Sequence, residues 1–286
     1  MTNPWTLCDP AERALGLDIA HWQGTDIPWE PTAKLGIEWV IAKTFHATGR
    51  VKSAEIQLEG ASKLSLICGR YAWWLPRVDT KMQAAAWAQI ESRFHLPVMI
   101  DVEEPDVDVR GAPLLRRLEE LIQRLADAIG RLPIIYTGAW YWREWLGNLD
   151  SEIVASCELA HAAYPRKAAM GLAYHDAVDE VCAQTPPVLA APWALRKIQP
   201  LIWQFDGDKG LFLPSGTGVV SGVDVDVNTA ARTRLRGLIA ALRDTDPHPG
   251  PIPEPGLHLG DPTAGGTLWD STNSFELPLD KGPKEQ

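Results

Sequence analysis

The sequence has little positive charge. Its 286 residues include 27 Lys and Arg against 37 Asp and Glu, which gives a formal net charge of −10. Nucleic acids and anionic membrane surfaces are both bound through basic patches, so this balance disfavours both kinds of partner. No apolar run approaches the roughly 20 residues that span a bilayer. We therefore expect no nucleic-acid partner and no membrane insertion.

Cysteine is scarce, and its spacing matches no metal motif. The four cysteines lie far apart without a Cys-x-x-Cys pair, so we interpret them as reduced core thiols: Cys8, Cys68, Cys157 and Cys182. The seven histidines form no His-Glu-x-x-His spacing, and there is no Gly-x-Ser-x-Gly elbow. Gly216-Thr217-Gly218 begins a dinucleotide-like pattern, but Ser221 replaces its last glycine. We expect neither a metal nor a cofactor.

Tryptophan, in contrast, is abundant. The chain has 13 Trp against five Tyr and five Phe. Indole rings are large, flat and partly polar, which suits stacking on sugar faces in a wet cleft as well as packing in a core. Composition alone therefore only suggests a carbohydrate ligand.

Short apolar runs alternate with stretches of helical periodicity, a pattern typical of a parallel α/β fold. Eight ranges are predicted as strands: 15–20, 37–43, 66–73, 96–102, 132–137, 157–164, 201–205 and 219–225. Helices are predicted at 80–94 and 113–130, with a closing helix after Asn228-Thr229 as its N-cap. Eight strands favour a barrel over an open sheet, and the weak helices late in the chain predict an irregular one.

The composition changes after Arg243. Proline occupies every second position from Pro247 to Pro255, which is incompatible with a helix or a strand ladder. We therefore predict a barrel domain over residues 1–243 and an extended Pro/Gly-rich tail over residues 244–286. Apolar residues recur along that tail, which suggests that it docks onto a surface or another chain.

Acidic residues stand at the ends of several predicted strands, where barrel enzymes place catalytic groups. Asp18 lies near the end of the first strand, and Asp101 and Glu103 end the fourth. Asp224 and Asp226 end the last. Clustered carboxylates raise one another's pKa, which can provide a general acid at neutral pH beside an ionised partner.

These acids belong to longer motifs, which together resemble one family. The stretches are Gly16-Leu17-Asp18-Ile19-Ala20-His21-Trp22-Gln23-Gly24, residues 36–43, Pro97-Val98-Met99-Ile100-Asp101-Val102-Glu103, residues 133–138, Trp203-Gln204-Phe205 and Asp226-Val227-Asn228. In this order they resemble the family 25 glycoside hydrolases, which are N-acetylmuramidase lysozymes, over roughly residues 14 to 232. The resemblance implies an irregular TIM-like barrel of five β/α units plus three further strands.

The resemblance also implies roles. Glu103 would be the general acid, and Asp101 would orient the substrate's N-acetyl group or stabilise charge at the anomeric carbon. Asp18 and Asp226 would line the same mouth, with Asp224 as the alternative to Asp226. The sugar subsites would be bordered by five aromatic residues, for each of which core packing stays open: Trp22, Trp73, Tyr136, Tyr164 and Trp203. The implied reaction is cleavage of the β-1,4 bond between N-acetylmuramic acid and N-acetylglucosamine in peptidoglycan.

The sequence departs from the family at several points. Thr44-Phe45-His46 replaces the usual Thr-Glu-Gly-like turn after Lys43, and the stretch from Pro165 to Pro200 is long enough to form an added loop. Two rival functions follow from the same residues. Residues 222–228 also resemble the Asp-x-Asp-x-Glu strand of family 18 chitinases, but Asn228 replaces the acid. A muramidase-like barrel could also serve as a non-catalytic structural or wall-docking part of a phage particle.

Residues 1–16 show no basic region followed by an apolar stretch, so no signal peptide is predicted. A wall hydrolase without an export signal suggests a phage endolysin that waits in the host cytoplasm before its release to the cell wall. A lysozyme carried by the virion is the alternative, with a virion protein as a partner of residues 244–286.

Overall fold

The computed structural model describes residues 5–89, 95–164, 174–206 and 226–245, all within one compact unit, Met1–Asp246. Nine described strands form one sheet in the order β1-β9-β8-β7-β6-β5-β4-β2-β3. A further pairing between β1 and β2 closes the sheet into a barrel, to which β3 adds a short hairpin with β2. The predicted α/β barrel is therefore confirmed. The strands are β1 (Arg13–Ile19), β2 (Ile37–His46), β3 (Gly49–Arg50), β4 (Ile67–Trp73), β5 (Met99–Asp101), β6 (Ile134–Gly138), β7 (Glu158–Ala162), β8 (Ile202–Asp206) and β9 (Asp226–Ala231).

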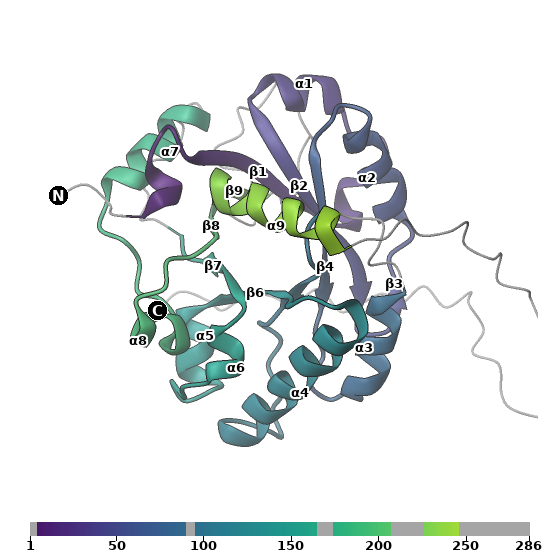
Figure 1. Cartoon of the computed structure of the whole chain (residues 1–286), viewed down its shortest axis with the longest axis vertical. Coiled ribbons are helices and arrows are strands. Elements are labelled where there is room, and N and C mark those ends of the chain that lie inside the picture. Colours follow the sequence, from purple (N-terminus) through teal and green to yellow (C-terminus); the bar gives the residue numbers. More distant parts are fainter. Residues whose placement is uncertain (1–4, 90–94, 165–173, 207–225, 246–286) are drawn as a thin grey trace, which may run out of the picture. The chain divides into compact units, whose positions relative to one another are not determined.

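Helices surround the ring of strands (Figure 1). The α-helices are α1 (Trp29–Lys34), α2 (Ser53–Ser62), α3 (Thr80–Ala88), α4 (Ala112–Ile129), α5 (Ala139–Glu144), α6 (Glu152–Ala155), α7 (Tyr174–Ala183), α8 (Ala191–Arg196) and α9 (Arg232–Thr245). Two 3-10 helices, η1 (Thr6–Cys8) and η2 (His21–Gln23), flank β1. In the described part of the chain, no helix is both long and apolar enough to cross a membrane.

The last strand runs opposite to its neighbours. The pairings β1–β2, β2–β4 and those from β4 through to β8 are parallel, whereas β9 is antiparallel to both β1 and β8. Asn228 and Thr229 lie within β9, paired with Gly16 and Leu15, so their prediction as an N-cap is wrong. The predicted strand over residues 219–225 lies outside the described residues, and β9 begins at Asp226, beyond its predicted end. Asn228 and Thr229 lie in the strand ladder because β9 pairs with both β1 and β8 and so closes the barrel.

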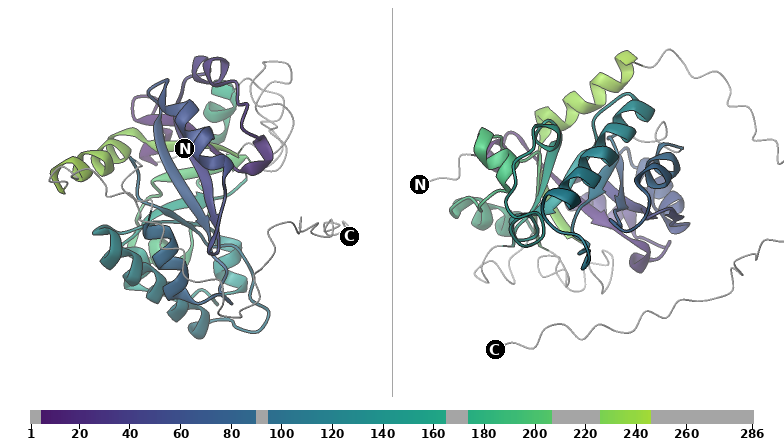
Figure 2. Two further views of the ribbon diagram at one scale, coloured as in Figure 1. Left: turned by 90° about the vertical axis from the view of Figure 1, so that its right-hand side faces the viewer. Right: turned by 90° about the horizontal axis from the view of Figure 1, so that it is seen from below.

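Side chains alternate between the barrel interior and the outer layer. In β2, Trp39 and Ile41 belong to the interior cluster, while Val40 and Ala42 pack outside. Trp39 lies over Gly16 of β1, where an added Cβ would come within 2.0 Å of the indole ring. Leu235 of α9 joins the interior cluster, and Figures 1 and 2 show α9 lying across one end of the strand ring. That helix therefore closes one end of the barrel and leaves the other for a site.

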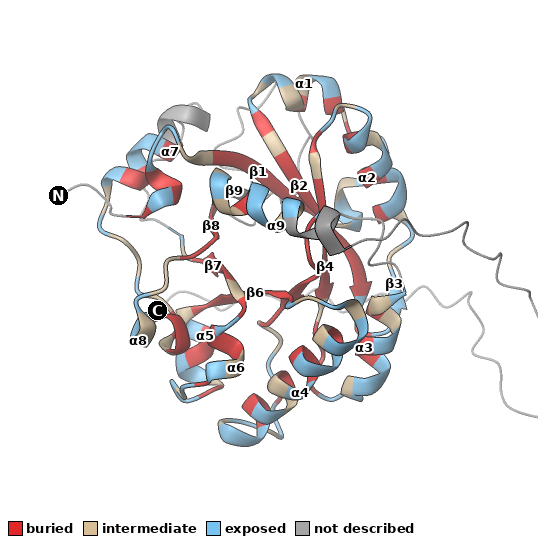
Figure 3. Ribbon diagram, in the orientation of Figure 1, coloured by how far each residue is buried: buried red, intermediate tan, exposed pale blue. Residues whose placement is uncertain are grey.

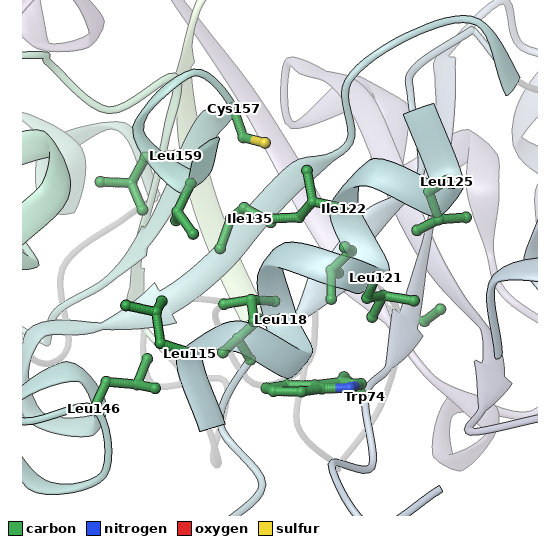
Figure 4. Close-up of a cluster of buried hydrophobic side chains, with 14 of the residues drawn as sticks. Trp74, Leu115, Leu118, Leu121, Ile122, Leu125, Ile135, Leu146, Cys157 and Leu159 are labelled. Atoms are coloured by element: carbon green, nitrogen blue, oxygen red, sulfur yellow. The ribbon is translucent and has the colours of Figure 1, made fainter. Parts of the chain in front are cut away.

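The outer layer is a second apolar core, and α4 provides much of it. The predicted stripe of residues 113–130 is buried along α4 and faces β6 and β7 (Figures 3 and 4). Leu118, Leu121 and Ile122 have no solvent exposure, and each such side chain contributes about 1.5–3 kcal/mol through burial. Gly130 ends the helix in a left-handed conformation, with φ of 72°.

The cysteine prediction is half right. Cys68 and Cys157 are free and buried, but Cys8 and Cys182 form a disulfide with their Cα atoms 5.3 Å apart. The two residues are separated by 174 positions, so no local spacing indicates the pair. The bond joins η1 to α7, and the stretch from Pro165 to Pro200, predicted as an added loop, contains the helices α7 and α8. The predicted tail begins within α9, and residues 246–286 lie outside the described residues.

Candidate active site

A layer of buried polar residues marks the end of the barrel opposite α9. Asp18 of β1, Lys43 of β2, Asp101 of β5 and Gln204 of β8 are all at least nine-tenths buried. Each lies toward the carboxyl end of its strand, where strand alternation turns it inward. The barrel interior nearby is apolar: Asp18 lines the same internal space as Trp39, Ile41, Met99, Tyr136, Ala160 and Ile202. Charges in such surroundings are costly unless they interact, which makes this layer the candidate site.

Asp101 is the most strongly perturbed acid of the layer. It is 4% exposed, and none of the described residues hydrogen-bonds to its Oδ1. Burial raises the pKa of Asp101 well above its ordinary value, and Glu103, Asp18 and Glu104 raise it further, against an opposing effect of Lys43. Asp101 is therefore a carboxyl group that binds a proton more readily than an ordinary aspartate.

Glu103 lies two residues beyond the end of β5 and is partly exposed. Its charge raises the pKa of both Asp101 and Lys43, so it belongs to the same group of side chains. The two predicted catalytic acids are thus brought together in different surroundings. One is enclosed in the barrel, and the other is accessible to a bound ligand.

Lys43 places a positive charge beneath these carboxylates. Burial lowers the pKa of Lys43, whereas Asp101, Glu103 and Glu104 act to raise it. Its ammonium lies 4.1 Å from the centre of the Trp73 ring, a cation–π contact that is strengthened by desolvation. The imidazole ring of His46 stacks on the same Trp73 ring, with ring centres 6.1 Å apart. His46 belongs to the stretch after Lys43 in which the sequence departs from the family pattern.

Asp18 is joined to two aromatic residues through Gln204. Nε2 of Gln204 donates to Oδ2 of Asp18 at 3.2 Å. Oε1 of the same amide accepts from the hydroxyl of Tyr136 at 2.5 Å and from that of Tyr164 at 3.0 Å. Tyr136 is buried in the barrel, whereas the Tyr164 side chain stands at the surface. The network therefore connects the floor of the site to its rim.

Of the predicted sugar-binding aromatics, three lie at this rim. Trp22 and Tyr164 are 63% and 58% exposed, and Trp73 ends β4 in contact with Lys43. Exposed rings near a group of acidic side chains are suited to stacking on sugars. The fourth, Tyr136, contributes only from within, through its hydroxyl.

Trp203 does not reach this site, contrary to the prediction. It is 2% exposed and packs edge-on against Trp5 and Phe205 in the outer core. Its indole N–H donates to the carbonyl of Ala163 at 2.8 Å. The reason is strand alternation: Gln204 points inward, so its neighbour Trp203 points outward.

The structure describes one of the two residues predicted as the acid of the last strand. Asp226 is the first residue of β9 and is paired with Asp18 of β1. This register brings its backbone to the same end of the barrel as the other acids. Asp224 lies outside the described residues.

Two site residues, Lys43 and Gln204, were given no role from the sequence, although both stand in recognised motifs. A lysine that ends the apolar run of residues 39–42 was a usable signal, because an unpaired buried charge is rare. Gln204, between two aromatic residues, carries no such signal. Across the described ranges, no group of three His, Cys, Asp or Glu residues is placed to hold a metal ion.

Comparisons with known proteins identify a family for this chain. The model of the glycosyl hydrolases family 25 matches residues 17–179, more than half of the chain. YegX, an uncharacterized protein of Escherichia coli K12, is 28% identical over 146 residues, which cover 48% of this chain and 53% of YegX. The chain thus spans about half the length of that relative.

Solved structures show the same fold. A family GH25 lysozyme from Aspergillus fumigatus superposes with a TM-score of 0.60 at 21% identity, over 79% of this chain and 99% of that one. A bacterial lysozyme from Streptomyces coelicolor gives 0.61 at 20% identity, with 80% and 97% covered. The catalytic domain of endolysin ply40, from Listeria bacteriophage P40, gives 0.55 at 16% identity, with 79% and 97% covered.

Proposed function

Because the chain belongs to the glycosyl hydrolases of family 25, we propose that it hydrolyses peptidoglycan. The bond cleaved is the β-1,4 linkage between N-acetylmuramic acid and N-acetylglucosamine. The observation that carries this proposal is the pairing of buried Asp101 with accessible Glu103 at the mouth of the barrel. Two carboxyl groups in unlike surroundings are what acid catalysis of glycoside hydrolysis requires.

Glu103 is the general acid in this mechanism. Its partly exposed position lets it approach the glycosidic oxygen, to which it transfers a proton as the bond to the anomeric carbon breaks. The substrate's own acetamido oxygen attacks that carbon and forms a cyclic oxazoline-type intermediate, a variant of the retaining scheme. The Glu103 carboxylate then removes a proton from the water that opens the ring, which returns the acid to its starting form.

Asp101 positions the acetamido group of the substrate and exchanges a proton with it. Its raised pKa means that it accepts a proton readily, so it can take the amide proton as the acetamido oxygen becomes nucleophilic and return it afterwards. Lys43 supports the ionised states of Asp101 and Glu103 during these transfers. We assign to Asp18 and Asp226, whose backbones pair across β1 and β9, the role of favouring the positive charge that develops at the anomeric carbon.

The exposed rings of Trp22 and Tyr164, with Trp73, are proposed to border the sugar subsites. Storage in a host cytoplasm, carriage on a virion and docking of residues 244–286 on a virion protein stay predictions. So does the division into a barrel and a separate tail.

The test is the chemistry of the product. Purified peptidoglycan is incubated with the full chain, and the new reducing ends are reduced with borohydride and identified after acid hydrolysis. The proposal expects reduced muramic acid to accumulate in step with the loss of turbidity. Reduced glucosamine instead would indicate a glucosaminidase, new amino termini without reducing ends would indicate an amidase, and no product would support the non-catalytic alternative.

A further inference from the structure

Gln204 uses both ends of its side-chain amide inside the barrel. It is 2% exposed, its nitrogen donates to Asp18, and its oxygen accepts from two tyrosines. These partners are distant in sequence: Asp18 lies 186 residues before Gln204, Tyr136 lies 68 before it and Tyr164 lies 40 before it. One buried amide therefore joins three segments that come from separate parts of the barrel wall.

The direction of each hydrogen bond in this network is determined by chemistry. An amide oxygen can only accept, so the Tyr136 and Tyr164 hydroxyls must both donate their single proton to Gln204. The amide nitrogen can only donate, so the Asp18 oxygen that faces it must accept, as an ionised carboxylate does. Turning the amide over would place its nitrogen against two hydroxyls and its oxygen against a carboxylate, which is the less favourable arrangement.

We propose that Gln204 is a positioning residue that holds Asp18 as an ionised acceptor and orients the Tyr164 hydroxyl at the rim as an acceptor toward the substrate. This inference rests on the proposed function. Any further hydrogen bond of the Tyr136 and Tyr164 hydroxyls is one in which the oxygen accepts, because each donates its proton to Gln204. The ligand groups that suit the Tyr164 hydroxyl are donors, such as an acetamido N–H or a sugar hydroxyl.

The position of Gln204 explains why it acts through other residues. It is enclosed by the barrel, with Ala162 of β7 and Asn228 of β9 as its strand neighbours, so it does not itself meet the ligand. Tyr164 is the part of the network that reaches the surface. Among the charged residues, Asp101 of β5 interacts electrostatically with Asp18, and the backbone of Asp226 in β9 pairs with that of Asp18.

The test compares two buried glutamines. Gln204→Met keeps the side-chain length but removes every hydrogen bond of the network. Gln83→Met is the matched control, because Gln83 is also fully buried and bonds only to backbone groups of Leu75 and Val78. Both variants are expected to lose some thermal stability, since each leaves buried polar groups unpaired.

Three measurements separate positioning from structure. For Gln204→Met we expect kcat/KM on peptidoglycan to fall at least tenfold and the acidic limb of its pH profile to move to higher pH, while Gln83→Met keeps the wild-type profile. Gln204→Glu should recover activity toward acidic pH, where the introduced carboxyl is protonated and can again donate to Asp18. The loss of Tm in Gln204→Met should be larger at pH 7 than at pH 3, because the hydrogen bond from Gln204 is stronger to ionised Asp18 than to protonated Asp18.

The outcomes are distinguishable. If the wild type releases no sugar ends from peptidoglycan, the proposed function fails, and the pH dependence of the Tm loss still decides the role of Gln204. If the wild type is active and Gln204→Met keeps its pH profile, with a Tm loss that is the same at both pH values, Gln204 is merely structural and this inference is overturned.

Discussion

Asp18 and Asp226 stand opposite each other on the antiparallel strands β1 and β9. Asp18 is the last residue but one of its strand, and Asp226 is the first residue of its own. Because β9 runs against the other barrel strands, its beginning lies where theirs end. A strand of reversed direction thus brings the backbone of an acidic residue to the end of the barrel where the parallel strands end.

Asp101→Asn should abolish most activity without weakening the fold. The raised pKa of Asp101 means that the folded protein binds this proton more tightly than the unfolded chain, so ionised Asp101 reduces stability once the pH exceeds its ordinary value of 3.8. The uncharged amide removes that cost at pH 7, and we expect Tm to hold or rise there. The advantage should vanish below pH 3.8, and a Tm several degrees lower at pH 7 would show instead that Asp101 is structural.

His161 should make the protein sensitive to acid. It is fully buried beside Trp5, and burial lowers its pKa to about 4 from 6.5. The unfolded chain therefore takes up this proton first, and stability is lost as the pH falls from 6.5 to about 4, by up to about 3 kcal/mol.

The measurement is chemical denaturation of wild type and His161→Gln across that pH range. The variant lacks the titrating ring, so its free energy of unfolding should change less between pH 6.5 and 4. Equal pH dependence in the two proteins would contradict the assignment.

Gly16 should tolerate no side chain. A Cβ at this position would lie 2.0 Å from the indole of Trp39, so Gly16→Ala must displace a ring that fills the barrel and should cost about 1–3 kcal/mol. Gly237→Ala is the control, because Gly237 lies in α9 with nothing within 4 Å of an added Cβ. That substitution should stabilise by about 0.4–1 kcal/mol, and urea titrations that rank the two the other way would contradict this packing.

Breaking the bond between Cys8 and Cys182 should destabilise the protein. It closes a separation of 174 residues, and loss of such a crosslink typically costs roughly 2–5 kcal/mol. We expect Cys8→Ser/Cys182→Ser and reduced wild type to lose similar stability, whereas reductant should not affect the double variant. Mass spectrometry after alkylation provides the direct check, and four alkylated thiols in the untreated wild type would contradict the pairing.

The sequence predicted the barrel well because its strands are buried on both faces and so read as apolar runs. The runs at Ile37 and Leu66 begin within one residue of β2 and β4. The inward acids Asp18 and Asp101 were found for a related reason: a carboxylate inside an apolar run is costly, so its presence implies use. Their position at strand ends then placed them in one mouth.

The errors arose where tertiary context decides. Both faces of a barrel strand are apolar, so composition does not say which of Trp203 and Gln204 points inward, and the aromatic residue was chosen wrongly. Asn228 and Thr229 suit a helix start locally, but closure of the barrel places them in β9. The bond from Cys8 to Cys182 depends on contact between η1 and α7, which no local pattern records.

The central claim is tested most directly by comparing Glu103→Gln with Glu104→Gln in one assay, the initial rate of reducing-end release from purified peptidoglycan at fixed pH. The two glutamates are adjacent and similarly exposed, but Glu104 forms an ion pair with Arg77 at 3.5 Å. With both variants shown to melt like wild type, Glu103→Gln should lose a factor of about 10²–10⁴ in rate, and Glu104→Gln should keep most of it. If Glu103→Gln remains within tenfold of wild type, or if Glu104→Gln loses as much, Glu103 is not the general acid of this protein.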